Sequence, residues 1–129
     1  MDETVILTSV ALEKRMYTLL VEGLDLTRQL AEAVDRGDPV TMRLILSMRA
    51  EPFEKLHDVR RALEERKNAL PPEDSARLAG LLNGEAAQRA EERPLAEQVA
   101  VNRRLLTQLF ELDKAVSLKL GKDQSHYKK

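Results

Sequence analysis

The chain has 129 residues, of which 43% are hydrophobic, 33% charged and 3% aromatic, and its formal net charge is −1. This length allows one domain with a real core, and the aliphatic content excludes a fully disordered chain. The absence of Cys excludes disulfides and thiolate ligands, and the near-zero net charge gives no broad positive field for nucleic acid. The apolar run VILTSVAL follows two acids and is too short to cross a bilayer, so we predict a cytoplasmic protein without membrane insertion.

Residues 5 to 33 carry a pattern typical of a long amphipathic helix. Alternating steps of four and three residues connect Val5, Ser9, Leu12, Met16, Leu19, Gly23, Leu26, Leu30 and Ala33. Four flanking positions widen this stripe, namely Leu20, Leu24, Thr27 and Val34. The wide stripe predicts that this helix packs against two neighbours rather than one. Gly23 lowers the helix propensity, and we expect it to permit a close approach of another helix.

The tetrapeptide RGDP, residues 36 to 39, is interpreted as a corner between two antiparallel helices. We expect Gly37 to adopt the left-handed conformation that ends the first helix, Asp38 to cap the second, and Pro39 to begin it. An adhesive Arg-Gly-Asp signal is the alternative, but it needs an exposed extracellular loop, and neither a secretion signal nor a disulfide is recognisable. The structural interpretation is therefore preferred.

A second helix is expected after Pro39, with a kink or short break at Pro52, which lacks an amide proton. Its apolar positions are Met42, Ile45, Phe53, Leu56, Val59, Leu63 and Leu70. Pro71 and Pro72 predict a second corner and a third helix that begins near Pro72. The polar stretch NGEAAQRAEERP follows, in which Pro94 either kinks the third helix or starts a fourth.

The last helix is expected to begin at Leu95 and to end at Gly121, followed by a flexible basic tail over residues 121–129. Apolar side chains cover more than half of its circumference, which indicates either a deeply buried helix or a face kept for a partner. The sequence therefore predicts a single all-α domain over residues 1–120. Its predicted architecture is an elongated, antiparallel bundle of three to four long helices.

The residues give little support for an enzyme or a metal site. Glu54 and His57 form one Glu-x-x-His pair, whereas a di-iron site in a helical bundle needs two such pairs. Arg15 and Arg28 could serve an enzyme of chorismate mutase type, but the Asp-bearing pattern of that enzyme's first helix is missing. No phosphate-binding loop, nucleophile or general acid is recognisable. We expect a binding protein without catalytic residues, metal or cofactor.

Three short motifs follow one another along the chain: an Ala-rich turn with Gly-Asp, a second helix containing Arg, and a late Asn followed by Leu. They consist of Ala31, Ala33, Gly37, Asp38, Arg49, Phe53, Leu56, Asn102, Leu105 and Leu106. From about Leu12 to Tyr127 this organisation resembles the flagellar type III export chaperones of the FlgN/FliT kind. The short length, the Gly-Asp turn and Tyr127 lean towards the FliT branch. The resemblance implies a cytoplasmic chaperone that holds a hook-associated or filament-cap subunit before export.

A client helix of such a chaperone is expected to lie in a groove between helices. We predict that five residues of the last helix bind the partner: Asn102, Leu105, Leu109, Leu112 and Val116. Asn102 is expected to set the register of the bound helix. The alternative is that these five residues close the core of the bundle. For the function, the alternative is a self-associating helical module, a homodimer without a client.

Overall fold

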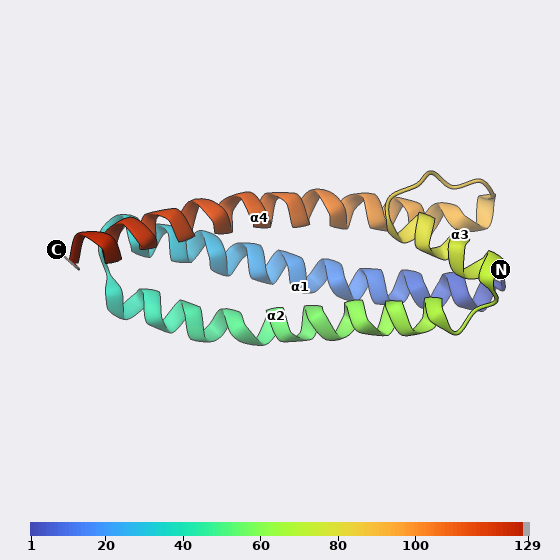
Figure 1. The fold of residues 1–129 in the computed structure, drawn as a ribbon, viewed down its shortest axis with the longest axis horizontal. Coiled ribbons are helices and arrows are strands. Elements are labelled where there is room, and N and C mark those ends of the chain that lie inside the picture. Colours follow the sequence, from blue (N-terminus) through green and yellow to red (C-terminus); the bar gives the residue numbers. More distant parts are fainter. Residues whose placement is uncertain (128–129) are drawn as a thin grey trace.

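The computed structural model describes residues 1 to 127, and these residues form four α-helices and one short 3₁₀ helix, without a strand. The helices are α1 (Glu3–Arg36), α2 (Pro39–Asn68), α3 (Pro72–Leu82), η1 (Ala90–Glu92) and α4 (Arg93–Tyr127). The three long helices lie side by side, and the short α3 lies beside one end of them (Figure 1). The predicted all-α, elongated bundle is confirmed.

α2 runs antiparallel to α1, whereas α4 runs parallel to α1 (Figure 1). The cause is α3 together with residues 83 to 89, which return the chain to the end where α1 begins. The bundle is therefore antiparallel only between α2 and the other two long helices. Pro94 lies in the first turn of the separate helix α4, a position where its missing amide proton costs no helical hydrogen bond.

The corner at residues 36 to 39 has the predicted geometry. Gly37 is left-handed, with a φ of 64°, and its N–H donates a hydrogen bond to the carbonyl of Val34 at 3.1 Å. The side chain of Asp38 accepts hydrogen bonds from the N–H of Thr41 at 3.1 Å and from its hydroxyl at 2.6 Å. Pro39 is the first residue of α2. The tripeptide is thus a helix corner within this fold.

Two expected interruptions do not occur. α2 continues through Pro52, which is buried within the helix. Packing of the whole of α2 along α1 offsets the one hydrogen bond that this proline cannot make. α4 continues through Gly121 to Tyr127, because a glycine lowers helix propensity without ending a helix by itself. The predicted tail therefore overlaps the helix, and residues 128 and 129 lie outside the described part of the chain.

α1 is the central helix, and it packs against both α2 and α4 as its wide stripe predicted. Every position of the predicted seam from Val5 to Ala33 is buried or half-buried. Gly23 does permit a close approach, because a Cβ atom built there would lie 2.8 Å from Cε1 of Phe53 on α2. The apolar stripe on α1 is thus the surface against which both other long helices pack.

Candidate functional site

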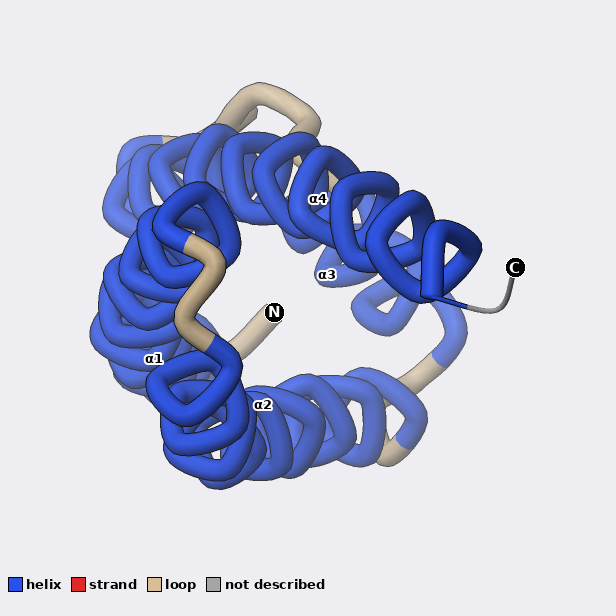
Figure 2. Tube along the Cα trace, turned by 90° about the vertical axis from the view of Figure 1, so that its left-hand side faces the viewer, coloured by secondary structure: helices blue, strands red, loops and turns tan. Residues whose placement is uncertain are grey.

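α1 forms the floor between α2 and α4, which have hardly any backbone contact with each other. The end-on view shows α1 between α2 and α4, with α3 at the far end on the side opposite α1 (Figure 2). α3 contacts both α2 and α4, and it occupies this position only near the beginning of α1. Beyond α3 lies a groove with Phe53 and Leu56 on one wall and Leu106 and Phe110 on the other, which we call the α2–α4 groove.

An apolar cavity of about 170 Å³ forms one part of this groove. Leu109 lies at its base and is only 6% exposed, whereas Phe110 lies at its rim and is 65% exposed. Phe53 and Phe110 are the only phenylalanines of the chain, and both line this cavity. Exposed aromatic side chains beside an apolar cavity are typical anchors for a protein partner.

A second, polar cavity of about 180 Å³ adjoins the first and shares Arg60 and Leu106 with it. Glu13 of α1 and Asn102 of α4 contribute to it, and only 4% and 3% of their respective surfaces are exposed. Nδ2 of Asn102 donates a hydrogen bond of 2.7 Å to the main-chain carbonyl of Glu13. Asn102 therefore ties α4 to α1 at the level of this cavity.

The carboxylate of Glu13 is the least satisfied polar group of the groove. Among the described residues no group donates a hydrogen bond to its buried Oε2 atom. Burial raises the pKa of Glu13, while the side chain of Asn102 and the charge of Arg60 act in the opposite direction. The groove thus contains a buried acidic group beside Asn102 and Arg60 that lacks a full set of hydrogen-bond donors.

An ion pair connects the two walls at the far end of the apolar cavity. Nη1 of Arg49 on α2 lies 2.6 Å from Oδ1 of Asp113 on α4. The guanidinium group of Arg49 also lies 5.0 Å from the ring centroid of Phe53, within the range of a cation–π contact. This bridge holds the two walls at one spacing and orients the aromatic ring of Phe53.

The five residues predicted to bind the partner lie on the inner side of α4, but only two of them line the groove. Leu109 lines the apolar cavity and Asn102 the polar one. Val116 is buried in the cluster around Leu26 and Leu30, and Leu105 and Leu112 are half-buried against the core. Three of the five, Asn102, Leu109 and Val116, are buried in the bundle, so they are not presented as an open surface.

Sequence reasoning missed the wall contributed by α2 and the exposed Phe110. Phe53 and Leu56 were assigned to the apolar face of the second helix and to the family motif, and Phe110 was not among the residues predicted to bind the partner. The scarcity of aromatic residues was a usable signal in the sequence, since they make up only 3% of the chain. Both phenylalanines line this one cavity. The pairing of α2 with α4 across a groove could not be read from either helix alone.

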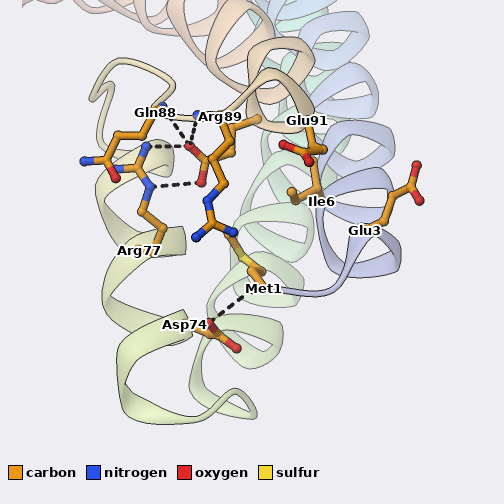
Figure 3. Close-up of a pocket in the computed structure, with 9 residues that line it drawn as sticks. Met1, Glu3, Ile6, Asp74, Arg77, Gln88, Arg89 and Glu91 are labelled. Atoms are coloured by element: carbon orange, nitrogen blue, oxygen red, sulfur yellow. Dashed lines mark hydrogen bonds and ion pairs between the residues drawn. The ribbon is translucent and has the colours of Figure 1, made fainter.

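A further cavity of about 290 Å³ lies where α3, η1 and the start of α1 meet (Figure 3). Arg77 of α3 reaches Glu92 through Nη2 to Oε1 at 2.7 Å and through Nε to Oε2 at 3.0 Å. The main-chain N–H of Gln88 donates to the same carboxylate at 2.8 Å. These bonds lower the pKa of Glu92 to about 2. The cluster ties the α3–α4 connection to α3, so we assign it a structural role.

Neither metal binding nor a membrane span is indicated for residues 1 to 127. Within them, no group of three or more His, Cys, Asp and Glu side chains is placed to hold a metal ion. Glu54 and His57 line a shallow depression on the exposed side of α2. None of the described helices combines the length and the apolar character needed to cross a bilayer.

Comparison with protein-family models, with curated proteins and with solved structures gives no significant match to this chain.

Proposed function

We propose that this protein is a cytoplasmic export chaperone that binds the terminal amphipathic helix of a flagellar hook-associated or filament-cap subunit in the α2–α4 groove. One observation carries the proposal: α3 occupies the fourth-helix position between α2 and α4 at one end, and beyond it this position is an open groove with apolar walls. A client helix placed there would add a fourth helix at the apolar cavity, beyond the end of α3.

The apolar cavity of the groove is about two helical turns long. Its lining runs from Phe53 to Arg60 on α2 and from Leu106 to Asp113 on α4, each about 11 Å of helix. A client helix that enters this cavity would extend past it over the Arg49–Asp113 ion pair, which joins the two walls at its far end. Its apolar face would cover Phe110, whose exposed ring is otherwise an unfavourable feature of the surface.

The client class comes from the sequence resemblance, and the groove supplies a physical reason for a chaperone role. A subunit that must pass through a narrow channel has to be kept unassembled, and its sticky terminal helix is the segment that needs cover. Binding of this kind needs apolar walls and a polar position that sets the register, and it needs no catalytic group. We therefore propose a binding protein without enzymatic activity.

The test is affinity purification of the tagged protein from its own cells, followed by identification of the proteins that co-elute. We expect a stoichiometric hook-associated or filament-cap protein with the wild type, and its loss with Phe110→Asp. Leu118→Asp is the matched control, because Leu118 is a 60% exposed apolar residue of the same helix that does not line the groove. Recovery of the protein alone would refute the proposed function, and equal loss in both variants would refute the groove as its site.

Leu109→Asp is a less suitable test than Phe110→Asp. Leu109 belongs to the core cluster with Leu20 and Leu24, and a buried, unpaired carboxylate there costs several kcal/mol. We therefore expect Leu109→Asp to lose its helical circular dichroism signal under conditions in which Phe110→Asp keeps it. If Leu109→Asp folds but no longer captures the client, Leu109 instead belongs to the partner-binding surface, as the sequence predicted.

A second candidate is a homodimer without a client, and one observation favours it. Val40, Leu44 and Met48 are exposed apolar residues that follow one another at a spacing of four on α2. Such a stripe is suited to pack against a second copy of itself. Sedimentation of the wild type as a dimer and of Leu44→Glu as a monomer, with no co-eluting client, would support this candidate over the chaperone.

A further inference from the structure

The α2–α4 groove is closed at one end by α3. Its apolar cavity adjoins the polar cavity through Arg60 and Leu106, and the polar cavity is lined by Leu82, the last residue of α3, and by Asn83. α3 contacts both α2 and α4 and lies at this end of the bundle (Figure 1). A helix that occupies the apolar cavity therefore comes from the opposite direction, over the ion pair between the two walls, and must end beside Asn83.

Two arginines lie at this closed end of the groove. Arg60 of α2 lines both cavities, and Arg103 of α4 lines the polar one. Both residues are exposed, and neither forms an ion pair with a side chain that the structure describes. At the other end of the apolar cavity, Arg49 is paired with Asp113 at 2.6 Å. Among the residues that line the two cavities, positive charge without an ion pair thus lies only at the closed end.

Two acidic residues also line the polar cavity, and neither forms an ion pair with these arginines. Oε1 of Glu64 lies 2.7 Å from Nζ of Lys67 instead. Oε2 of Glu13 is buried, and burial raises the pKa of this residue, which disfavours its ionised form. A negative group that enters the closed end therefore meets two exposed guanidinium groups.

The end of α3 does not need the two arginines either. Cationic side chains often donate hydrogen bonds to the last carbonyl groups of a helix. At the end of α3 the main chain does this instead, because the N–H groups of Asn83 and Glu85 donate to the carbonyls of Ala79 and Gly80, each at 3.0 Å. The two guanidinium groups are therefore available to the end of a second helix.

We infer that a client helix lies in the groove with its carboxyl end towards α3, parallel to α2 and antiparallel to α4. The last carbonyl groups of a helix carry partial negative charge and have no partner within the helix. Arg60 and Arg103 donate to these carbonyls and to a carboxylate at the helix end. The opposite direction would bring the positive end of the helix dipole against the same two cations. The inference rests on the proposed function and adds the direction of the bound helix.

The probes are two synthetic amphipathic peptides of about 18 residues, or five helical turns, with Leu on one face. Both are acetylated at the amino end, and they differ only at the carboxyl end, which is a free carboxylate or an amide. We expect the carboxylate peptide to bind the wild type about fivefold more tightly in fluorescence anisotropy at low ionic strength, because salt screens exposed charges.

Substitution of both arginines gives the deciding comparison. Arg60→Gln combined with Arg103→Gln should abolish the preference for the carboxylate peptide. Arg61→Gln combined with Arg104→Gln is the matched control, because these exposed neighbours on the same two helices line neither cavity of the groove. The control should keep the preference. Equal binding of the two peptides by the wild type, no binding of either, or equal loss of the preference in both double variants would each overturn the inference.

Energy transfer between two fluorophores measures the direction itself. The chain has no Cys, so Leu118→Cys offers one site for an acceptor, on the part of α4 that lies away from α3. A donor at the amino end of the peptide should transfer more energy to this acceptor than a donor at the carboxyl end, and the reverse order would overturn the inference. Capture of the client that depends on Phe110, without a preference for the carboxylate peptide, would leave the proposed function intact and refute only the direction.

Discussion

At the scale of single residues, the two buried glutamates differ in how their charge is satisfied. Glu92 receives two hydrogen bonds from Arg77 and another from the main chain of Gln88, so its ionised form is stabilised. Glu13 has no donor for Oε2, and burial raises its pKa. A satisfied acid of this kind holds the fold together, whereas an unsatisfied buried one lowers the stability of the fold.

The pKa of Glu92 leads to a prediction about stability and pH. This pKa falls from 4.5 to about 2 on folding, so the stabilisation is complete above pH 4.5 and is lost as the pH falls towards 2. We expect Glu92→Gln to be less stable than the wild type by about 2 kcal/mol at pH 7, and this difference to shrink at low pH. Urea unfolding followed by circular dichroism at pH 7, 4 and 2.5 measures it.

Glu91→Gln is the matched control for this experiment, because Glu91 is the exposed neighbour of Glu92 in the same 3₁₀ helix. Its unfolding curves should follow those of the wild type at every pH. A difference between Glu92→Gln and the wild type that stays constant from pH 7 to 2.5 would show that the ion pair with Arg77 does not stabilise the fold.

At the scale of elements, the contact of α1 with α2 depends on a glycine in the middle of a helix. The ring of Phe53 comes within 2.8 Å of the place where a Cβ atom at position 23 would lie, which is why the low helix propensity of Gly23 is tolerated. The same ring forms part of one wall of the α2–α4 groove. The spacing of two helices and the shape of the groove therefore depend on the same contact.

Two Gly→Ala substitutions should have opposite effects on stability. Gly23→Ala places its methyl group 2.8 Å from Cε1 of Phe53, so we expect a loss of about 1 kcal/mol despite the gain in helix propensity. Gly121→Ala meets nothing within 4 Å and should raise stability by up to about 1 kcal/mol. Thermal unfolding of both variants measures the difference, and an increase for Gly23→Ala would contradict the close packing of Phe53.

At the scale of the whole molecule, α1 provides most of the packing surface for the other two long helices. α2 and α4 each pack along α1 and have hardly any backbone contact with each other. Their side chains meet in two shared core clusters and in the Arg49–Asp113 ion pair. Near α3, the core cluster consists of residues of α1, α3 and α4, among them Ile6, Leu78 and Leu95. At this end of the molecule α3 lies between α2 and α4, which it contacts on either side.

This arrangement predicts where backbone amides exchange most slowly with solvent. The middle of α1, around residues 20 to 30, has neighbours on two sides and should be the most protected segment. The facing parts of α2 and α4 have one long neighbour each and should exchange faster. Hydrogen exchange followed by mass spectrometry measures this order, and equal protection of all three helices would indicate that α2 and α4 pack together in solution.

Most of the secondary structure followed from local chemistry in the sequence. Gly37, Asp38 and Pro39 form a corner through their own backbone preferences and one cap, which no distant contact has to create. The seam on α1 predicted two neighbours because its width is set by the residues of that helix. The expectations at Pro52 and Gly121 were wrong because a local helix breaker was weighed without the packing and propensity of the rest of the helix.

The sequence by itself determined the helices, their corners and the core face of α1, since caps, turns and periodicity act over a few residues. Only the tertiary structure decided how the apolar surface of α4 is divided between α1 and the groove, and so which residues can meet a partner. It also decided that Glu13 is buried beside Asn102, residues 89 positions apart in the chain. Such pairings depend on how whole helices pack, and helical periodicity carries no information about which helix lies opposite.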